Sequence, residues 1–589
     1  MKKTIIPLAV FLIILSTTGL SLSQNNKEDS KFQKTLESYL DELWKFYPTA
    51  ATLAGFHAYD DKLEDFSEKN LEKRMETLDT FNQEFVAKVD VTQLSPEARI
   101  DHEIMRDALD MEVLRNENLL PWEYNPIFYN EIFRDCIQSL FAKEFAPIET
   151  RAKNAAERLK NLPKLIKQAK ENLKTPAQLY TETAIKQFPG ILDFYKNTLP
   201  GLIENTPADS KSKLQDGLNK VLPELESYLN FLKNELLPRS TGNFRLGQQV
   251  HTRLLRLTWQ NDIPIQELIN RASTDFRNIR NKMFFTCVPF YEIMDPRIDL
   301  QNPPPGLTED QLYDEVISHV MERITGEHVL KDEYINRIKD SASEIKDFFT
   351  NNQMIVLPDG DFDIEPMPIC SQGITMARTI APGAYESNGT TTIQIAPICE
   401  DWNEEQIESF LTEYNNSYLY LWTIRKVYPG EFVPLFFTGK YPSLVRKLYP
   451  NKALIKSWPV IYEELLVTSG FGGYDLRLRL NQLKYLLKAV NNFQLELNIH
   501  SGSITKDDAI RLMKIRGFQT QAEAERKWNS IILNPGEAAF AYVGYQEILD
   551  MEKAYKNLKG NSFSKKEFLE RLLSYGALPL RYLKKKMQE

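Results

Sequence analysis

The residues best suited to chemistry lie in one short stretch, Arg425–Glu431, which reads RKVYPGE. A long polar, amphipathic run from Glu404 to Trp422 precedes this stretch, and Pro429–Gly430 breaks it. Arg425 keeps its proton in proteins, so it cannot coordinate a metal ion, and a cationic Lys426 cannot act as a carboxylate base. Such cations can instead hold the carboxylate of a ligand.

Other constellations for catalysis are weak in this sequence. The six histidines are His57, His102, His251, His319, His328 and His500, and none belongs to an HExxH motif. The sequence contains no Gly-x-Ser-x-Gly nucleophile elbow and no P-loop or dinucleotide fingerprint. Glu496 and His500 share one helix face and could both point into a cleft, although a buried histidine with satisfied hydrogen bonds is favoured there.

Composition favours an ordinary globular protein that does not bind nucleic acid. The 589 residues are 42% hydrophobic and 26% charged. The formal net charge is −9, and there is no basic block beyond Lys584–Lys586, which disfavours a nucleic-acid partner. The four cysteines allow three disulfide pairings among which the sequence does not choose, and none has CxxC spacing; they are Cys136, Cys287, Cys370 and Cys399.

The first residues predict export. Lys2 and Lys3 precede the apolar run Ile5–Leu15, which is too short to span a bilayer, and small residues follow at Ser21 and Ser23. We therefore predict a signal peptide at 1–23 and a periplasmic or extracellular protein without an integral membrane span. No cysteine follows the apolar run, so a lipid anchor is disfavoured.

The rest of the chain, 24–589, is predicted to be one mainly α domain with a small sheet. Apolar residues recur at helical spacing in many segments, and a break is expected at Pro163. Short β-branched runs at 379–385 and 390–396 flank Ser387-Asn388-Gly389, which predicts a hairpin. The predicted helices cover 31–47, 70–89, 96–116, 149–173, 207–237, 264–283, 309–325, 332–351, 463–467, 476–497, 506–515, 522–532 and 537–558.

Landmarks along the chain resemble the bacterial proteins labelled domain of unknown function 885. The segment from Pro48 to Asp60 matches the pattern P-x-x-A-T-x-x-G-x-x-x-Y-D of that family. Further matches are Arg151…Ala155-Ala156…Arg158-Leu159…Pro163, Asn172-Leu173, Phe244–Gly247, Pro382-Gly383 with Thr391–Ala396, and Gly576…Leu578-Pro579-Leu580. The resemblance runs from about Phe32 to Leu583 and implies a helical, zincin-like and carboxypeptidase-like fold.

The positions that would carry the chemistry of that family are replaced. The His-Glu-x-x-Pro-Gly-His motif aligns with 425–431, so Arg425 and Glu431 take the His positions and Lys426 takes the Glu position. The Glu-Gly-Trp-Ala motif aligns with 456–459, and the Glu that closes it is retained as Glu463. Two later runs align with 496–500 and 535–545, where the polar Tyr, Lys and Gln of the family are lost.

The resemblance therefore implies a zinc site whose ligands are missing. A catalytic zinc needs about three protein ligands, and nearby cations repel it. We predict a non-catalytic relative of zinc metallopeptidase-like proteins, without a cofactor, that binds a peptide or protein in the inherited cleft. The candidate cleft residues are Arg425, Lys426, Tyr428, Glu431, Lys456, Trp458, Glu463, Glu496, His500, Tyr542 and Tyr545.

Two alternatives stay open at this stage. The first is an active hydrolase that uses an altered metal set, Glu431, Glu463 and His500, or a residual site. The second is a purely structural envelope protein. The sequence does not fix the ligand, the partner or the oligomeric state.

A last expectation concerns what replaces the metal. A zinc ion would tie two helices together, so its loss removes a cross-link from the core. Arg425 and Lys456 now carry positive charge on these two segments, and Glu431 and Glu463 carry negative charge. We therefore predict that Arg425 and Lys456 lie within ion-pair reach of Glu431 or Glu463.

Overall fold

The computed structural model describes residues 26–294, 296–355, 357–372, 375–400 and 402–589. The signal peptide predicted for 1–23 lies outside these residues, as does the predicted boundary after it. Among the described residues, no helix has both the length and the apolar character that a membrane crossing requires.

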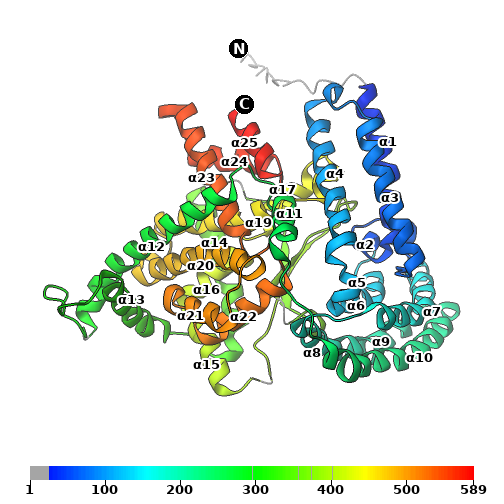
Figure 1. Ribbon diagram of the computed structural model, residues 1–589, viewed down its shortest axis with the longest axis horizontal. Helices are drawn as coiled ribbons and strands as arrows, with labels where there is room; N and C mark the ends of the chain where they lie inside the picture. The colour runs from blue at the N-terminus through cyan, green and yellow to red at the C-terminus, as the bar shows by residue number, and fades with distance from the viewer. Residues whose placement is uncertain (1–25, 295, 356, 373–374, 401) are drawn as a thin grey trace, which may run out of the picture.

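The first ten helices form what we call the N-terminal lobe. Helices α1, α3 and α4 stand side by side, and α5 to α10 gather at one end of them (Figure 1). The bounds are α1 (Lys27–Phe46), α2 (Pro48–Leu53), α3 (Glu68–Ala87), α4 (Pro96–Leu114), α5 (Pro121–Tyr124), α6 (Pro126–Ala142), α7 (Ile148–Asn172), α8 (Gln178–Asp193), α9 (Leu199–Glu204) and α10 (Ala208–Phe231).

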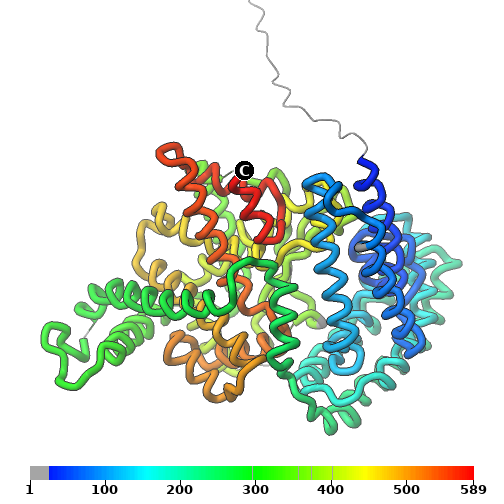
Figure 2. Tube along the Cα trace, turned by 45° about the horizontal axis from the view of Figure 1, so that its top comes forward, coloured from blue at the N-terminus to red at the C-terminus, as the bar shows by residue number. Residues whose placement is uncertain are grey.

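The C-terminal lobe comprises α12 to α25 and lies beside the first lobe, with α11 (Gly247–Trp259) in contact with both (Figure 1). Figure 2 shows the pair α12–α13 projecting from the body as an arm. The bounds are α12 (Ile265–Ile293), α13 (Glu309–Thr325), α14 (Tyr334–Asn352), α15 (Glu404–Glu413), α16 (Asn416–Lys426), α17 (Phe432–Lys440), α18 (Leu444–Leu448), α19 (Lys452–Thr468), α20 (Leu476–His500), α21 (Lys506–Gly517), α22 (Gln521–Leu533), α23 (Phe540–Lys559), α24 (Lys565–Ser574) and α25 (Leu580–Gln588).

A small sheet precedes α16 and connects the lobes. Strands β1 (Phe362–Pro366), β2 (Ala377–Ile380) and β3 (Thr391–Ile395) lie in the order β1-β3-β2. The antiparallel β2–β3 pair confirms a hairpin here, but β2 ends at Ile380, so most of the predicted first run, 379–385, lies in the connection. The parallel β1–β3 pair was not predicted. In the β2–β3 connection, the Tyr385 N–H donates to the Ala54 carbonyl of the N-terminal lobe at 3.0 Å. Strand β2 also contacts α16, so the sheet bridges α2 and α16.

The mainly α class is confirmed, and the two lobes share their core. One cluster of buried apolar side chains extends from Phe32 to Met587. Two smaller clusters accompany it, one around Trp528 and one around Leu254. The cysteines Cys136, Cys287 and Cys399 are free thiols, and the first two are buried.

The helix break expected at Pro163 is wrong. Helix α7 continues through this proline from Ile148 to Asn172. Proline removes one hydrogen bond from a helix interior and costs about 3 kcal/mol. Leu162, Leu165 and Ile166 are buried around it, on a helix that packs along α10, and burying each such side chain contributes about 1.5–3 kcal/mol. Burial therefore outweighs the local preference. Similarly, α19 begins at Lys452, well before the predicted 463–467, and runs through Pro459.

Close packing of α19 against α23 places the C-terminal part of the cavity described below. Gly544 of α23 is buried against α19, and a Cβ atom there would overlap Ser457 Oγ and the Ala453 carbonyl oxygen. Only glycine allows the two backbones to approach this closely.

We expect Gly544→Ala to lower the free energy of unfolding by about 1–3 kcal/mol, because the added methyl forces the two helices apart. The matched control is Gly439→Ala in α17, where a Cβ would meet no atom within 4 Å. That control should be neutral or stabilising by at most about 1 kcal/mol. Urea unfolding followed by circular dichroism gives both values, and equal stability of the two variants would contradict the packing argument.

Candidate ligand-binding cavity

A sharp turn between α16 and α17 brings charged residues together. Helix α16 ends at Lys426 and α17 begins at Phe432, so the predicted break at Pro429–Gly430 is confirmed. Gly430 has a φ of +42°, and a Cβ on it would lie 2.8 Å from the Val427 carbonyl oxygen. Glycine is therefore required for the turn that brings Glu431 back beside Lys426.

Glu431 is held between two lysines. Its Oε1 and Oε2 atoms each lie 2.7 Å from Lys456 Nζ, and Oε1 lies 3.1 Å from Lys426 Nζ. Burial alone would raise the pKa of Glu431, but Lys456 and Lys426 prevail and lower it to about 2. The carboxylate thus stays ionised and serves as the shared counter-ion of both cations.

Arg425 pairs with Glu463 inside the core. Arg425 Nε donates to Glu463 Oε2, and the guanidinium stacks on the ring of Tyr485. Both side chains are almost fully buried. Burial raises the pKa of Glu463 to about 7, against the pull of Arg425. This pair and the Lys456–Glu431 pair confirm the prediction that Arg425 and Lys456 lie within ion-pair reach of Glu431 or Glu463.

The spacing on α19 explains this arrangement. Lys456 and Glu463 are seven residues apart, which is close to two helical turns, so they lie on the same face of α19. Asn451 caps the helix by accepting a hydrogen bond from the Leu454 N–H at 2.8 Å. Helix α19 therefore offers one cation and one anion to the end of α16.

Arg425, Lys426, Glu431 and Lys456 border a cavity of about 360 Å³, which we call the cationic cavity, whereas Glu463 lies outside its lining. It lies among β2, α16, α19, α20, α22 and the start of α23. Aromatic side chains, including Tyr418, Trp422 and Tyr485, form part of its wall. Its charged lining consists of the cations Arg378, Arg425, Lys426, Lys456, Lys488, Arg526 and Lys527 and the carboxylates Glu431, Glu523 and Glu537.

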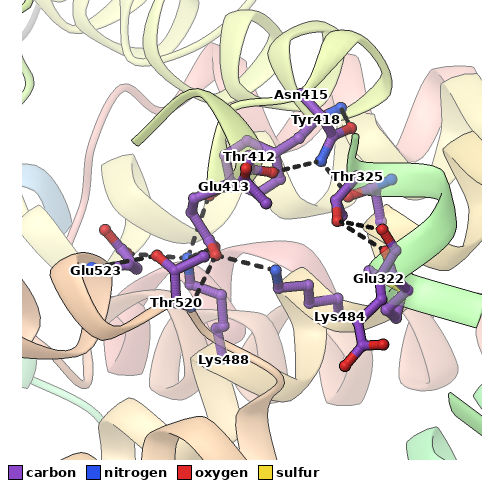
Figure 3. Close-up of polar contacts among 12 residues, drawn as sticks. Glu322, Thr325, Thr412, Glu413, Asn415, Tyr418, Lys484, Lys488, Thr520 and Glu523 are labelled. Carbon is purple, nitrogen blue, oxygen red and sulfur yellow. Dashed lines mark hydrogen bonds and ion pairs between the residues drawn. The ribbon is translucent and has the colours of Figure 1, made fainter. Parts of the chain in front are cut away.

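A buried ionic network supports one wall of this cavity. Figure 3 shows the carboxyl group of Glu413 between the amines of Lys484 and Lys488, at 3.0 and 2.9 Å. Lys488 also contacts Glu523 at 2.9 Å, and Glu523 binds Arg526. Burial would raise the pKa of Glu413, but the two lysines lower it. The network ties α15, α20 and α22 together.

Lys527 differs from the other lysines of the cavity. Lys426 and Lys456 are paired with Glu431, and Lys488 is paired with Glu413 and Glu523. Within the described part of the chain, Lys527 has no hydrogen-bond or ion-pair partner. Burial and the neighbouring Arg526 lower its pKa to about 7. An amine in this setting gains from an anion that enters the cavity.

The remaining predicted cleft residues lie outside the lining of the cationic cavity. Tyr428 and Trp458 are buried in the core. Tyr542 donates to Asp275 Oδ2 at 2.8 Å, and Tyr545 packs against the main core. Sequence reasoning missed Arg378 of β2, Lys488 of α20, and Arg526 and Lys527 of α22, because these residues lie far apart along the chain and carry no local motif.

Glu496 and His500 belong to a separate buried cluster. Glu496 Oε1 lies 2.9 Å from His251 Nε2 and accepts the Gly536 N–H at 2.8 Å, and Glu496 Oε2 accepts the Ala538 N–H at 3.3 Å. His500 is buried as expected, but only its Nε2 has a hydrogen-bond partner, the Ile531 carbonyl oxygen at 3.0 Å, whereas its Nδ1 has none among the described residues. This cluster holds the backbone on both sides of Glu537, at the border of the cavity.

The residues in the motif positions do not fit zinc. Arg425 and Lys426 offer no lone pair while they are protonated, and Glu463 and Glu431 are engaged by cations. Across the described residues, no group of three or more His, Cys, Asp or Glu side chains is arranged to hold a metal ion. The alternative set Glu431, Glu463 and His500 is therefore not assembled in this structure.

Comparison with known families identifies the family of this chain. The profile of the family described as "Bacterial protein of unknown function (DUF885)" matches residues 48–587. The chain belongs to the DUF885 family. No protein with curated function matches it significantly.

Two solved structures share the fold of this DUF885 protein. One, from Shewanella oneidensis, is described as a "putative lipoprotein of unknown function"; it has a TM-score of 0.77 and 24% identity and covers 95% of this chain and 100% of its own. The other, described as the "putative lipoprotein from Colwellia psychrerythraea", has a TM-score of 0.73 and 15% identity and covers 95% of this chain and 98% of its own. At these identities the likeness concerns the fold alone.

We expect Arg425→Met to lower the free energy of unfolding by about 3–5 kcal/mol, because Glu463 would be left buried without its counter-ion. The double variant Arg425→Met/Glu463→Gln removes both charges and should recover more than half of the loss. Denaturant unfolding of the single and double variants measures this coupling. Additive losses would show that the pair does not act as a unit.

The pKa of Glu431 predicts a specific acid sensitivity. Its ordinary value is 4.5 and its folded value is about 2, so its ionised form stabilises the fold above about pH 4.5 and this contribution is lost as pH falls toward 2. From about pH 5 to pH 3, the unfolding free energy of the wild type should fall by roughly 2 kcal/mol more than that of Glu431→Gln. Urea unfolding at each pH provides the comparison. Parallel pH profiles would contradict the assignment.

Proposed function

We propose that this DUF885 protein is a non-catalytic binding protein that holds an acidic peptide or protein segment in the cationic cavity. The observation that carries the proposal is Lys527, an amine without an ion-pair partner among the described residues, in a cavity whose charged lining residues are mostly cations. A carboxylate group of a ligand would form an ion pair with the amine of Lys527. The aromatic wall provides apolar contact area for the rest of the ligand.

The state of the carboxylates in the cavity argues against hydrolysis. A general base works best with a pKa near the working pH. Glu431 has a pKa of about 2 and is already bound by two lysines, so it is a poor proton acceptor. Glu463 has a pKa near 7 but lies buried behind Arg425. We therefore propose that the cavity descends from a zincin-like, metallopeptidase-like site and has kept its shape for binding alone.

The test uses Lys527→Met, which removes an available charge without leaving another group unpaired. At about pH 6, where Lys527 is protonated, the variant should bind a tri-glutamate peptide about tenfold more weakly than the wild type, as measured by calorimetry. At about pH 8, where Lys527 has lost most of its charge, the two affinities should converge. Arg526, Glu523, Lys488 and Lys426 face Lys527 and keep their charges across this range.

The matched control is Lys553→Met, an exposed lysine of α23 that does not line the cavity. This control should bind the peptide like the wild type at both pH values. If both variants weaken peptide binding equally, the loss of affinity reflects the net charge of the protein, and binding in the cavity is not supported. Failure of the wild type to bind acidic peptides would reject the proposed function.

Metal analysis separates binding from the hydrolase alternative. Purified protein should contain far less than one zinc per chain, and Lys456→Glu, which introduces an acid at a motif position, should not create a zinc site because Arg425 and Lys426 remain. Stoichiometric zinc that is lost on changing Glu431 or His500 would instead support the alternative of an active hydrolase.

A further inference from the structure

A second and larger cavity lies between the two lobes. It measures about 690 Å³ and is bordered by α1, α4 and α6 of the N-terminal lobe, by α11, and by residues 448–452 and 535–540 of the C-terminal lobe. Its walls are mostly apolar and include Trp44, Met111, Phe128, Leu254 and Phe540. We call it the apolar cavity.

Among the carboxylates of the apolar cavity, Glu131 of α6 is set apart. Asp107 is bound by Arg581 at 2.6 Å, Asp135 by Arg134 at 2.7 Å and Glu112 by Arg74 at 3.1 Å. Glu131 is exposed to the cavity and, within the described residues, makes no hydrogen bond or ion pair. Burial by the surrounding walls raises its pKa. Glu64, which also lines the cavity, accepts hydrogen bonds from the Thr49 N–H and hydroxyl at 2.9 Å. A cationic group that enters the cavity would therefore find in Glu131 a carboxylate that has no direct hydrogen-bond or ion-pair partner among the described residues.

The two cavities adjoin each other. Glu537 lines both of them, and its neighbours Pro535 and Ala538 line the apolar and the cationic cavity, respectively. Glu496 accepts the N–H groups of Gly536 and Ala538, so the border is held on either side of Glu537. Arg378, a cation of the cationic cavity, contributes to the electrostatic environment of Glu131 in the other. The two cavities are therefore neighbours across Glu537.

The two cavities also contain unpaired groups of opposite charge. The cationic cavity offers the amine of Lys527, and the apolar cavity offers the carboxylate of Glu131. We propose, as an extension that rests on the proposed function, that the ligand is a peptide that occupies both cavities. Its acidic end binds at Lys527, its apolar side chains fill the apolar cavity, and an ammonium group pairs with Glu131.

The experiment compares peptides of the series Lys-Phe-(Ala)n-Glu-Glu, in which n rises stepwise, with the same series carrying acetyl-norleucine in place of Lys. At the best length, the wild type should bind the Lys-Phe peptide about tenfold more tightly than its uncharged counterpart, because one extra charge pair forms in a poorly solvated site. Glu131→Gln should abolish this preference and leave the affinity for tri-glutamate unchanged. Norleucine with a free N-terminus and acetyl-lysine separate an α-amine from a side-chain amine as the group that binds.

Glu235→Gln, an exposed carboxylate outside both cavities, is the matched control and should keep the preference. Because Glu131 has no partner to lose, Glu131→Gln should unfold like the wild type, and a thermal melt checks this. If Glu131→Gln keeps the preference while tri-glutamate binding persists, the extension into the apolar cavity is rejected and the proposed function stands. If neither tri-glutamate nor the Lys-Phe series binds, both proposals fall.

Discussion

Glu431 shared between two lysines is the interaction on which the rest of this site depends. Two cations at the end of α16 and on α19 would repel each other in a poorly solvated setting. One carboxylate, returned to them by the turn at Gly430, offsets that repulsion. Arg425 and Glu463 repeat the arrangement one layer deeper. Ion pairs therefore act together with apolar packing in setting the orientation of α16 relative to α19.

The buried ionic groups beside the cavity form a second layer of the same design. Glu413, Lys488 and Glu523 connect α15, α20 and α22, and each charge meets at least one opposite charge. Breaking one member of such a set leaves a buried charge uncompensated, which costs more than the intact pair contributes. These pairs hold Lys488 and Glu523 in place before a ligand arrives, and such preorganisation lowers the cost of binding.

Much of the helical framework could be predicted from sequence, because apolar periodicity is a local signal. Helix α1 has buried Phe32, Leu36 and Leu43 at the expected spacing. The break at Pro429–Gly430 and the ion pairs across it were also predictable, since the charges stand at matching motif positions. Strand β1 was not predictable, because a parallel partner has no turn signal beside it. Pro163 misled for a related reason, since the burial that overrides it comes from distant residues.

The cavity itself lay beyond sequence reasoning. Arg526 and Lys527 belong to α22 whereas Lys488 belongs to α20, and Glu413 meets Lys484 across 71 residues of chain. Only the fold brings such groups together. Glu496 and His500 show the converse, because their spacing correctly indicated one helix face but did not reveal that His251 would share Glu496 in the core.

The shared carboxylate also makes positions 425, 426, 431, 456 and 463 interdependent in sequence variation. Replacing Glu431 alone strands two lysines, and replacing Arg425 alone strands Glu463. Each position is tolerant only of changes that its partners match. Charged residues at these positions should therefore be replaced together during evolution. A single replacement would be selected against because it destabilises the fold, whatever its effect on ligand binding.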